Sequence, residues 1–280
     1  MNRDLTSARI RKAVVFLMLC IGAVVFSIPF LWTVSTALKT NEQVYAVPPR
    51  WIPNPIEWGN FRDAWTELPF PTFVLNTVTI TVLATFGQVL SASLVAYGFA
   101  RFKFRGRNAL FYLMLSTMML PSQVTMIPVF LLWRQLGLID TFAPLIVPAF
   151  FGGGAFTIFL LRQFYLTVPR DLDEAAMLDG ASPFGIWWRI LLPLSRPALI
   201  TVVLFSFLTH WDDFMGPLIY LNTMEKYTVS IGLRMFQDMF GTKLELIMAA
   251  SLIHIIPTIV LFFIAQRYFV KGIALTGLKG

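Results

Sequence analysis

The chain has 280 residues, of which 57% are hydrophobic and 13% charged, whereas about a quarter of the residues in an ordinary soluble domain are charged. This composition excludes a soluble domain and indicates a polytopic membrane protein. We therefore expect the lipid bilayer as a partner and, despite the net charge of +7, no nucleic acid.

The single cysteine, Cys20, excludes an intramolecular disulfide. His210 and His254 lack metal-ligand spacing, so we predict no metal site.

Six segments are apolar over about the 20 residues that a helix needs to cross a bilayer. Their apolar residues run continuously instead of alternating, which favours helices over barrel strands. The first run is too long for the core of a signal peptide, so we interpret it as a retained span. We therefore expect an all-α membrane protein with six transmembrane helices, forming one domain over residues 1–280. In chain order, the expected spans are Ala13–Leu38, Phe73–Phe99, Ala109–Trp133, Phe142–Phe164, Ala198–Tyr220 and Leu246–Tyr268.

Lys and Arg residues are distributed unevenly between the two sides of these spans. About two thirds of the 22 basic residues fall on the side that holds both termini and the connection between the fourth and fifth spans. An excess of basic residues marks the cytoplasmic side of a membrane protein. We therefore expect both termini, and the segment at about 165–197, to be cytoplasmic.

The largest segment expected on the opposite, extracytoplasmic side is about 40–72. Six prolines and three tryptophans lie in it. Proline prevents a continuous helix and fixes local backbone angles, and tryptophan favours the membrane–water boundary. We expect a rigid lid that lies along the membrane surface.

The segment at about 165–197 has the pattern of a helix–turn–helix. Asp171 is expected to be the N-cap of its first helix, with Glu174 three residues later in the reciprocal position of a capping box. Gly180 suits the left-handed residue that commonly ends such a helix. Ser182 and Pro183 then suit the N-cap and first position of a second helix.

The second arm of this segment is more apolar than a solvated loop. It must pack against the underside of its own spans or against a partner, and both alternatives stay open for Trp187 and Trp188. Packing within the chain does not explain the small pair Ala175 and Ala176 followed by Gly180. Small side chains allow the surface of a partner to approach a helix closely.

Residues 174–193 read EAAMLDGASPFGIWWRILLP. This segment resembles the cytoplasmic coupling loop in permease subunits of bacterial ATP-binding-cassette importers, which docks into a cleft of the ATP-hydrolysing subunit. The resemblance implies a bacterial or archaeal plasma membrane protein. It also implies coupling to the ATPase through eight residues: Glu174, Ala175, Ala176, Asp179, Gly180, Ile190, Leu192 and Pro193.

Further matches resemble the carbohydrate, maltose-type group of these permeases. The group implies a sugar or oligosaccharide substrate, a second and unlike permease subunit, and an extracytoplasmic solute-binding protein. Asp212 stands where Asn is more common, which affects the assignment of the substrate. The matching residues are Asn60-Phe61, Asn76-Thr77, Trp211 to Phe214, Pro217-Leu218 and the tail from Gln266 to Gly280.

Ionisable groups within spans are costly and usually face the bundle interior or water. The pair Asp212 and Asp213 is expected in the outer part of the fifth span, beside Trp211 as a surface on which a sugar stacks, and we assign these residues, with Phe214, to the translocation path. Alternatively, one Asp caps a broken helix and the other meets interfacial water. Asn76 belongs either to the path or to helix packing.

The chain has no G-x-x-x-x-G-K-[ST] loop, H-E-x-x-H or G-x-S-x-G motif. We therefore expect a transport subunit that is not an enzyme and has no cofactor of its own, with ATP and Mg²⁺ bound by a separate partner. One alternative is an importer permease for a phosphorylated polyol such as glycerol phosphate. The other is a free-standing secondary transporter, for which the 174–193 match has no role.

Overall fold

The structure is a computed structural model that describes residues 2–239 and 243–276. Helices are the regular elements of these residues, and no strand occurs among them. The α-helices are α1 Asn2–Ala37, α2 Asn41–Val44, α3 Gly59–Thr66, α4 Phe70–Arg101, α5 Arg107–Ser116, α6 Ser122–Gln135, α7 Ala143–Ile146, α8 Ala155–Thr167, α9 Asp171–Leu178, α10 Pro183–Ile186, α11 Leu192–Leu194, α12 Arg196–Trp211, α13 Met215–Tyr220, α14 Val229–Met239 and α15 Leu244–Thr276. Short 3₁₀ turns are Thr117–Met119, Val147–Phe150 and Met224–Lys226, and Trp187–Leu191 is a π-helical turn.

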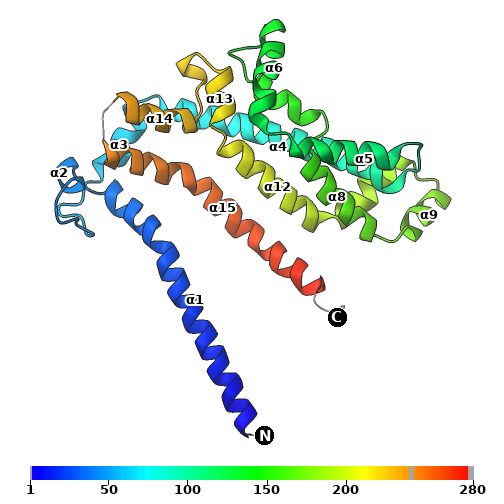
Figure 1. Cartoon of the computed structure of the whole chain (residues 1–280), viewed down its shortest axis with the longest axis horizontal. Coiled ribbons are helices and arrows are strands. Elements are labelled where there is room, and N and C mark those ends of the chain that lie inside the picture. Colours follow the sequence, from blue (N-terminus) through cyan, green and yellow to red (C-terminus); the bar gives the residue numbers. More distant parts are fainter. Residues whose placement is uncertain (1, 240–242, 277–280) are drawn as a thin grey trace. The chain divides into compact units, whose positions relative to one another are not determined.

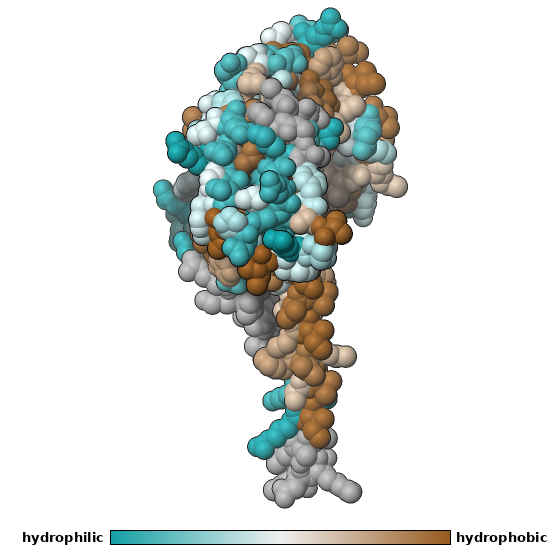
Figure 2. All heavy atoms as spheres, turned by 90° about the vertical axis from the view of Figure 1, so that its left-hand side faces the viewer, coloured by the Kyte–Doolittle hydropathy of each residue, from teal (hydrophilic) through white to brown (hydrophobic). Residues whose placement is uncertain are grey.

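Four runs of the described residues are long and apolar enough to cross a membrane. A further two bent pairs of helices pass the same test together, so the chain has up to six spans by length and composition. The four runs are Arg9–Ala37, Phe70–Arg101, Ala143–Thr167 and Leu244–Gln266. Apolar side chains of α1 are exposed, among them Phe16 and Phe26. The space-filling view shows brown, hydrophobic spheres along this helix (Figure 2).

The third and fifth expected spans are not single straight helices. The third bends by 100° between Met119 and Ser122, because Leu120 has the extended backbone that a residue before proline favours. The fifth ends early: α12 stops at Trp211, and a separate helix, α13, begins at Met215. Neither break was predictable from hydrophobicity, because both segments stay apolar on both sides of the break.

The chain divides into two compact units, of which the first comprises residues 1–68 and 233–255. In this unit the amide of Asn60 in α3 donates to the carbonyl oxygens of Ala37 (2.9 Å) and Lys39 (2.8 Å). The ammonium group of Lys39 lies 3.9 Å from the ring centroid of Trp32. The segment after α1 is thus tied to the end of that helix, and its position at the membrane surface stays a prediction.

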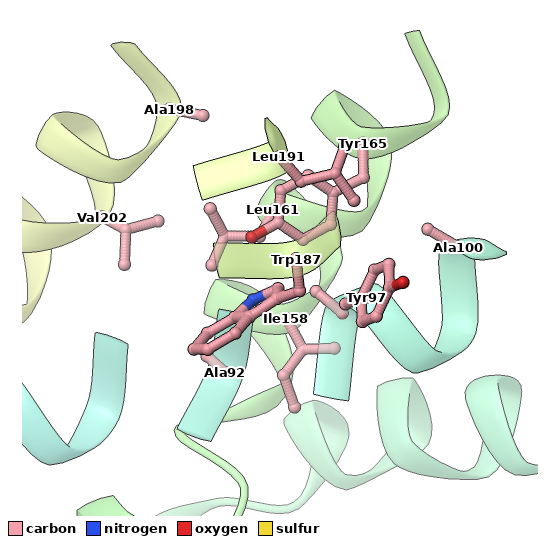
Figure 3. Close-up of a cluster of buried hydrophobic side chains, with 11 residues drawn as sticks. Ala92, Tyr97, Ala100, Ile158, Leu161, Tyr165, Trp187, Leu191, Ala198 and Val202 are labelled. Atoms are coloured by element: carbon pink, nitrogen blue, oxygen red, sulfur yellow. The ribbon is translucent and has the colours of Figure 1, made fainter. Parts of the chain in front are cut away.

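The second unit comprises residues 69–232 and 256–280. Its centre is α4, which packs along α8 and α12 (Figure 1). Trp187 lies 1% exposed within a cluster that these helices share with the π-helical turn, as Figure 3 shows. The close approach of α4 to the segment before α8 requires Gly153, since a Cβ there would lie 2.4 Å from the carbonyl oxygen of Gln88.

Candidate functional site

The segment from α9 to α11 begins one residue earlier than the capping prediction requires. Arg170 already has helical backbone angles and is the N-cap, so Asp171 is the first residue of α9 and makes no capping bond. The predicted capping box of Asp171 and Glu174 is therefore wrong. Carboxylates in the first turn nevertheless interact favourably with the positive end of a helix.

The turn after α9 agrees with its sequence pattern. Gly180 has φ +82°, the left-handed conformation expected at the end of α9. Ser182 is the N-cap of α10, and its hydroxyl accepts a hydrogen bond from the backbone N–H of Gly185 at 3.1 Å. Pro183 occupies the first helical position, where its missing N–H is not needed.

Beyond α10 the chain widens into the π-helical turn Trp187–Leu191. In this turn the backbone N–H of Leu192 donates to the carbonyl oxygen of Trp187, five residues earlier. The next residue, Pro193, has no N–H to donate. The helix run from Pro183 to Leu194 then meets α12 at an angle of 83°. This bend separates residues 171–194, from α9 to α11, from the span that follows them. These residues are called the arm below.

The arm is anchored to the C-terminal end of α4 by a buried ion pair. The guanidinium of Arg101 lies 2.7 Å from the carboxylate of Asp173, and the two side chains are 5% and 9% exposed. Arg101 also donates to the carbonyl oxygen of Val168 at 3.0 Å. Burial raises the pKa of Asp173 above its ordinary value, and the positive charge of Arg101 opposes this increase.

Two further hydrogen bonds join the arm to α4. The hydroxyl of Tyr97 donates to the carbonyl oxygen of Pro183 at 3.0 Å, and Arg170 donates to that of Ala100 at 3.3 Å. A pocket of about 110 Å³ lies at this junction. Its lining residues are Tyr97, Arg101, Phe102, Arg170, Asp173, Glu174 and Met177.

The eight predicted coupling residues lie toward the surface of this anchored arm. Five are exposed and three are half-buried, in contrast to Asp173 and Trp187. Exposed apolar side chains accompany them, and among these Leu178 is 89% exposed. The exposed residues are Glu174, Ala175, Asp179, Gly180 and Pro193, the half-buried ones Ala176, Ile190 and Leu192, and the exposed apolar ones Leu172, Met177, Leu178, Phe184 and Trp188.

The structure resolves the question left open for the two tryptophans. Trp187 packs inward against Tyr165 and Leu161 in the buried cluster (Figure 3). Trp188 is 57% exposed. One ring therefore fixes the arm to its own spans, and the other lies on the surface that remains available to a partner.

The predicted path residues lie at the break between α12 and α13. Trp211 is buried and stacks on Phe207, with ring centroids 5.3 Å apart. The N-cap of α13 is Phe214, and the carboxylate of Asp213, one residue earlier, accepts a hydrogen bond from the N–H of Gly216 in the first turn of this helix at 3.1 Å. Asp212 is exposed and Phe214 half-buried.

Asn76 lies away from this break, near the start of α4. Its amide donates to the carbonyl oxygens of Glu225 (2.8 Å) and Tyr227 (3.0 Å). The hydroxyl of the next residue, Thr77, accepts from the N–H of Val229 at 2.9 Å. These bonds attach the segment before α14 and the first residue of that helix to α4. They give Asn76 a packing contact, and its assignment to the path stays a prediction.

A family model described as "binding-protein-dependent transport system inner membrane component" matches residues 88–275. The chain belongs to this family. It is therefore a membrane-embedded component of a binding-protein-dependent transport system, and its apolar helices fit a multi-pass plasma membrane protein. The family match begins within α4 and includes the whole anchored arm.

Curated relatives share most of the length of this permease. It is 34% identical over 270 residues to the probable ABC transporter permease protein YurM of Bacillus subtilis (strain 168), covering 95% of this chain and 87% of that protein. It is 34% identical over 229 residues to the arabinooligosaccharides transport system permease protein AraQ of Halalkalibacterium halodurans, covering 81% of each. Over 265 residues it is 31% identical to the sn-glycerol-3-phosphate transport system permease protein UgpE of Yersinia pestis, covering 92% and 94%.

A solved structure has the same fold as this permease. It is a bacterial ABC transporter involved in the import of the acidic polysaccharide alginate. The similarity covers 94% of this permease and 98% of that chain, with a TM-score of 0.83 and 25% identity.

Sequence reasoning missed the residues that anchor the arm of this permease. In the sequence, Arg101 is one of several basic residues near the end of an apolar run, and nothing local distinguishes Tyr97 or Asp173 from their neighbours. Sequence reasoning also missed the polar contacts inside the helix bundle, where the amide of Gln88 donates to Thr157 at 3.0 Å and its oxygen lies 2.8 Å from the His210 ring. A polar residue within an apolar span was the available signal, since such groups need a partner.

Proposed function

We propose that this chain forms half of the translocation path of an ATP-driven importer and is coupled to a separate ATPase subunit through residues 171–193. The observation that carries this proposal is the anchored arm, whose buried side fixes it to α4 and whose other side exposes Glu174, Gly180 and apolar residues. An exposed apolar surface that is rigidly held is suited to binding a partner. The chain would then transmit movement without hydrolysing ATP itself.

The proposed assembly contains two permease subunits, two ATPase subunits and an extracytoplasmic binding protein. We infer that this permease is one transmembrane domain with six spans, counting each bent pair as one, and that both termini are cytoplasmic. The asymmetric distribution of Lys and Arg supports this orientation. The family match over 88–275 includes parts of both compact units, which supports a single domain.

We propose a neutral sugar or oligosaccharide as the substrate. The relatives named for arabinooligosaccharides and the structure named for alginate import support a carbohydrate. UgpE, named for sn-glycerol-3-phosphate, keeps a phosphorylated polyol as the alternative. Phosphate recognition favours Arg or Lys, whereas the residues at the α12–α13 break are Asp212 and Asp213.

A reconstituted importer tests the coupling proposal. The double variant Glu174→Lys/Gly180→Leu is expected to insert normally but to lose ATP-dependent uptake and co-purification of the ATPase, because it changes the exposed side of the arm. A matched control is Asp63→Lys/Gly137→Leu, since Asp63 is exposed and Gly137 also has positive φ with no atom within 4 Å of an added Cβ. Normal uptake by the first variant would contradict the proposal.

A substrate panel tests the proposed solute in the same proteoliposomes. ATP-dependent uptake of neutral oligosaccharides, with no uptake of glycerol phosphate, is the expected result. The reverse selectivity would overturn the carbohydrate assignment but leave the coupling proposal intact. Uptake without ATP, ATPase or binding protein would instead indicate a secondary transporter.

A further inference from the structure

The turn between α4 and α5 is strongly basic and contains a pocket. Residues 101–107 include four basic side chains and no acidic one. Arg101 is used by its ion pair with Asp173, while Lys103 and Arg105 are exposed. The pocket has a volume of about 300 Å³, and its lining residues are Lys103, Phe104, Gly106, Arg107, Asn108 and Ala109.

The wall of this pocket is partly fixed by Arg107. Its guanidinium donates to the carbonyl oxygen of Phe102 at 3.3 Å and to the side chain of Asn108 at 3.4 Å. These contacts use two of the five N–H donors of an arginine and hold the group in place. Gly106, with φ +83°, allows the tight turn between the two helices. The pocket therefore presents one positioned guanidinium and one exposed ammonium, that of Lys103.

The location of the pocket matches the headgroup region of a bilayer. It lies where α4, which is long enough to span, meets α5, the first part of a bent span. Apolar side chains of α5 extend from it along the exposed surface, and Leu110, Tyr112 and Leu113 are 50%, 67% and 64% exposed. A ligand with an anionic head and apolar chains would satisfy both surfaces together.

We propose that this pocket binds the phosphate of an anionic phospholipid in the cytoplasmic leaflet, with the acyl chains lying along α5. Arg and Lys are the side chains that bind phosphate, and basic pockets beside membrane helices on the cytoplasmic side bind anionic headgroups. Free phosphate shares this headgroup chemistry but makes no use of the apolar face of α5. The inference rests on the proposed orientation of the chain and not on its transport activity.

Native mass spectrometry of the full chain in its importer complex, extracted from membranes of defined composition, tests this site. We expect phosphatidylglycerol to be retained and zwitterionic phosphatidylcholine to be lost. Each basic residue near a membrane surface contributes about fivefold to anionic lipid affinity. Lys103→Gln/Arg107→Gln should therefore weaken phosphatidylglycerol binding about 25-fold. The matched control Arg9→Gln/Arg11→Gln removes two exposed basic residues of α1 and should retain the lipid.

The outcomes of this experiment distinguish a specific phospholipid site from non-specific attraction and from a site for free phosphate. Equal lipid loss in both double variants would indicate non-specific attraction and overturn the site. Binding of inorganic phosphate alone in phosphatidylcholine nanodiscs, lost in Lys103→Gln/Arg107→Gln, would overturn the lipid assignment. The variant Lys103→Arg/Arg107→Lys keeps both charges and should retain the lipid, so loss of binding through misfolding is distinguished from loss of charge.

Discussion

The ion pair between Arg101 and Asp173 offers a direct test of how the arm is held. In Arg101→Gln, the neutral side chain no longer compensates the buried carboxylate, and the bond to the Val168 carbonyl is weakened. We expect α9 to detach from α4 more often and coupling to fall with it. The variant Arg101→Met/Asp173→Leu removes both charges and fills a similar volume, so it should keep the arm attached.

The expected magnitude follows from the burial of the pair. Both side chains are less than one tenth exposed, so solvent screens them little, and breaking such a pair from one side costs about 3–5 kcal/mol. Replacing both partners by apolar residues is often close to neutral, so the double variant should recover most of this loss.

The pH dependence of Arg101→Gln follows from the raised pKa of Asp173. A buried carboxyl with a raised pKa contributes stability that is fully present below the unfolded pKa of about 3.9 and lost as pH rises through the folded pKa. In Arg101→Gln the positive charge of Arg101 no longer opposes the effect of burial, so the pKa of Asp173 in the folded protein rises further. The defect of Arg101→Gln should therefore be smaller at pH 5 than at pH 8.

Amide hydrogen exchange over residues 171–178 in the reconstituted complex measures this detachment directly. A loss of 3–5 kcal/mol corresponds to exchange that is faster by about a hundredfold to a few thousandfold, since about 1.4 kcal/mol is a factor of ten. The double variant should stay within about tenfold of the native rate. Exchange in Arg101→Gln within about threefold of the native rate at both pH values would refute the anchoring role of the pair.

Two other substitutions test the packing around α4. Gly153→Ala places a methyl group 2.4 Å from the Gln88 carbonyl oxygen at a residue with φ +62°, so we expect a loss of about 2–5 kcal/mol from overpacking and backbone strain, seen as a lower thermal midpoint in detergent. Gly152→Ala is the control, because its φ is +102° but nothing lies within 4 Å; an equal loss in both would refute the steric argument. Tyr97→Phe removes the bond to Pro183 and should cost about 1 kcal/mol, or about fivefold faster exchange over 184–186, and unchanged exchange would show that the bond contributes nothing.

Helix positions were predictable from the sequence, but the interruptions were not. Apolar runs locate α1, α4 and α15, and four of the six predicted ends lie within a few residues of the observed ones. Burial in lipid requires length and hydrophobicity alone. At Pro121 a local steric effect bends a run that stays apolar on both sides. After Trp211 the helix breaks although composition suggests continuation, and a new helix begins at Met215 with the Asp213 carboxylate bonded to its first turn.

The candidate site was predictable on its exposed side and not on its buried side. Gly180 and Ser182 predict the turn because a left-handed residue and an N-cap are determined by a few neighbouring residues. The sequence pattern alone is therefore sufficient to identify them. The partners Arg101 and Asp173 lie in different segments, and each has an ordinary local explanation as an orienting charge or a first-turn carboxylate. Only the fold brings them within 2.7 Å of each other.

One helix, α4, is held near both of its ends. Thr77 accepts a hydrogen bond from the first residue of α14, and Arg101 pairs with Asp173 of the arm. The two residues are 24 positions apart, which corresponds to about 36 Å at roughly 1.5 Å per residue, and no proline lies between them. A rod of this length shifts or tilts as a whole, so displacement of the arm would displace the start of α14 in the same motion. Under the coupling proposed above, transmission along α4 requires no chain of side-chain rearrangements, only the stiffness of a single helix.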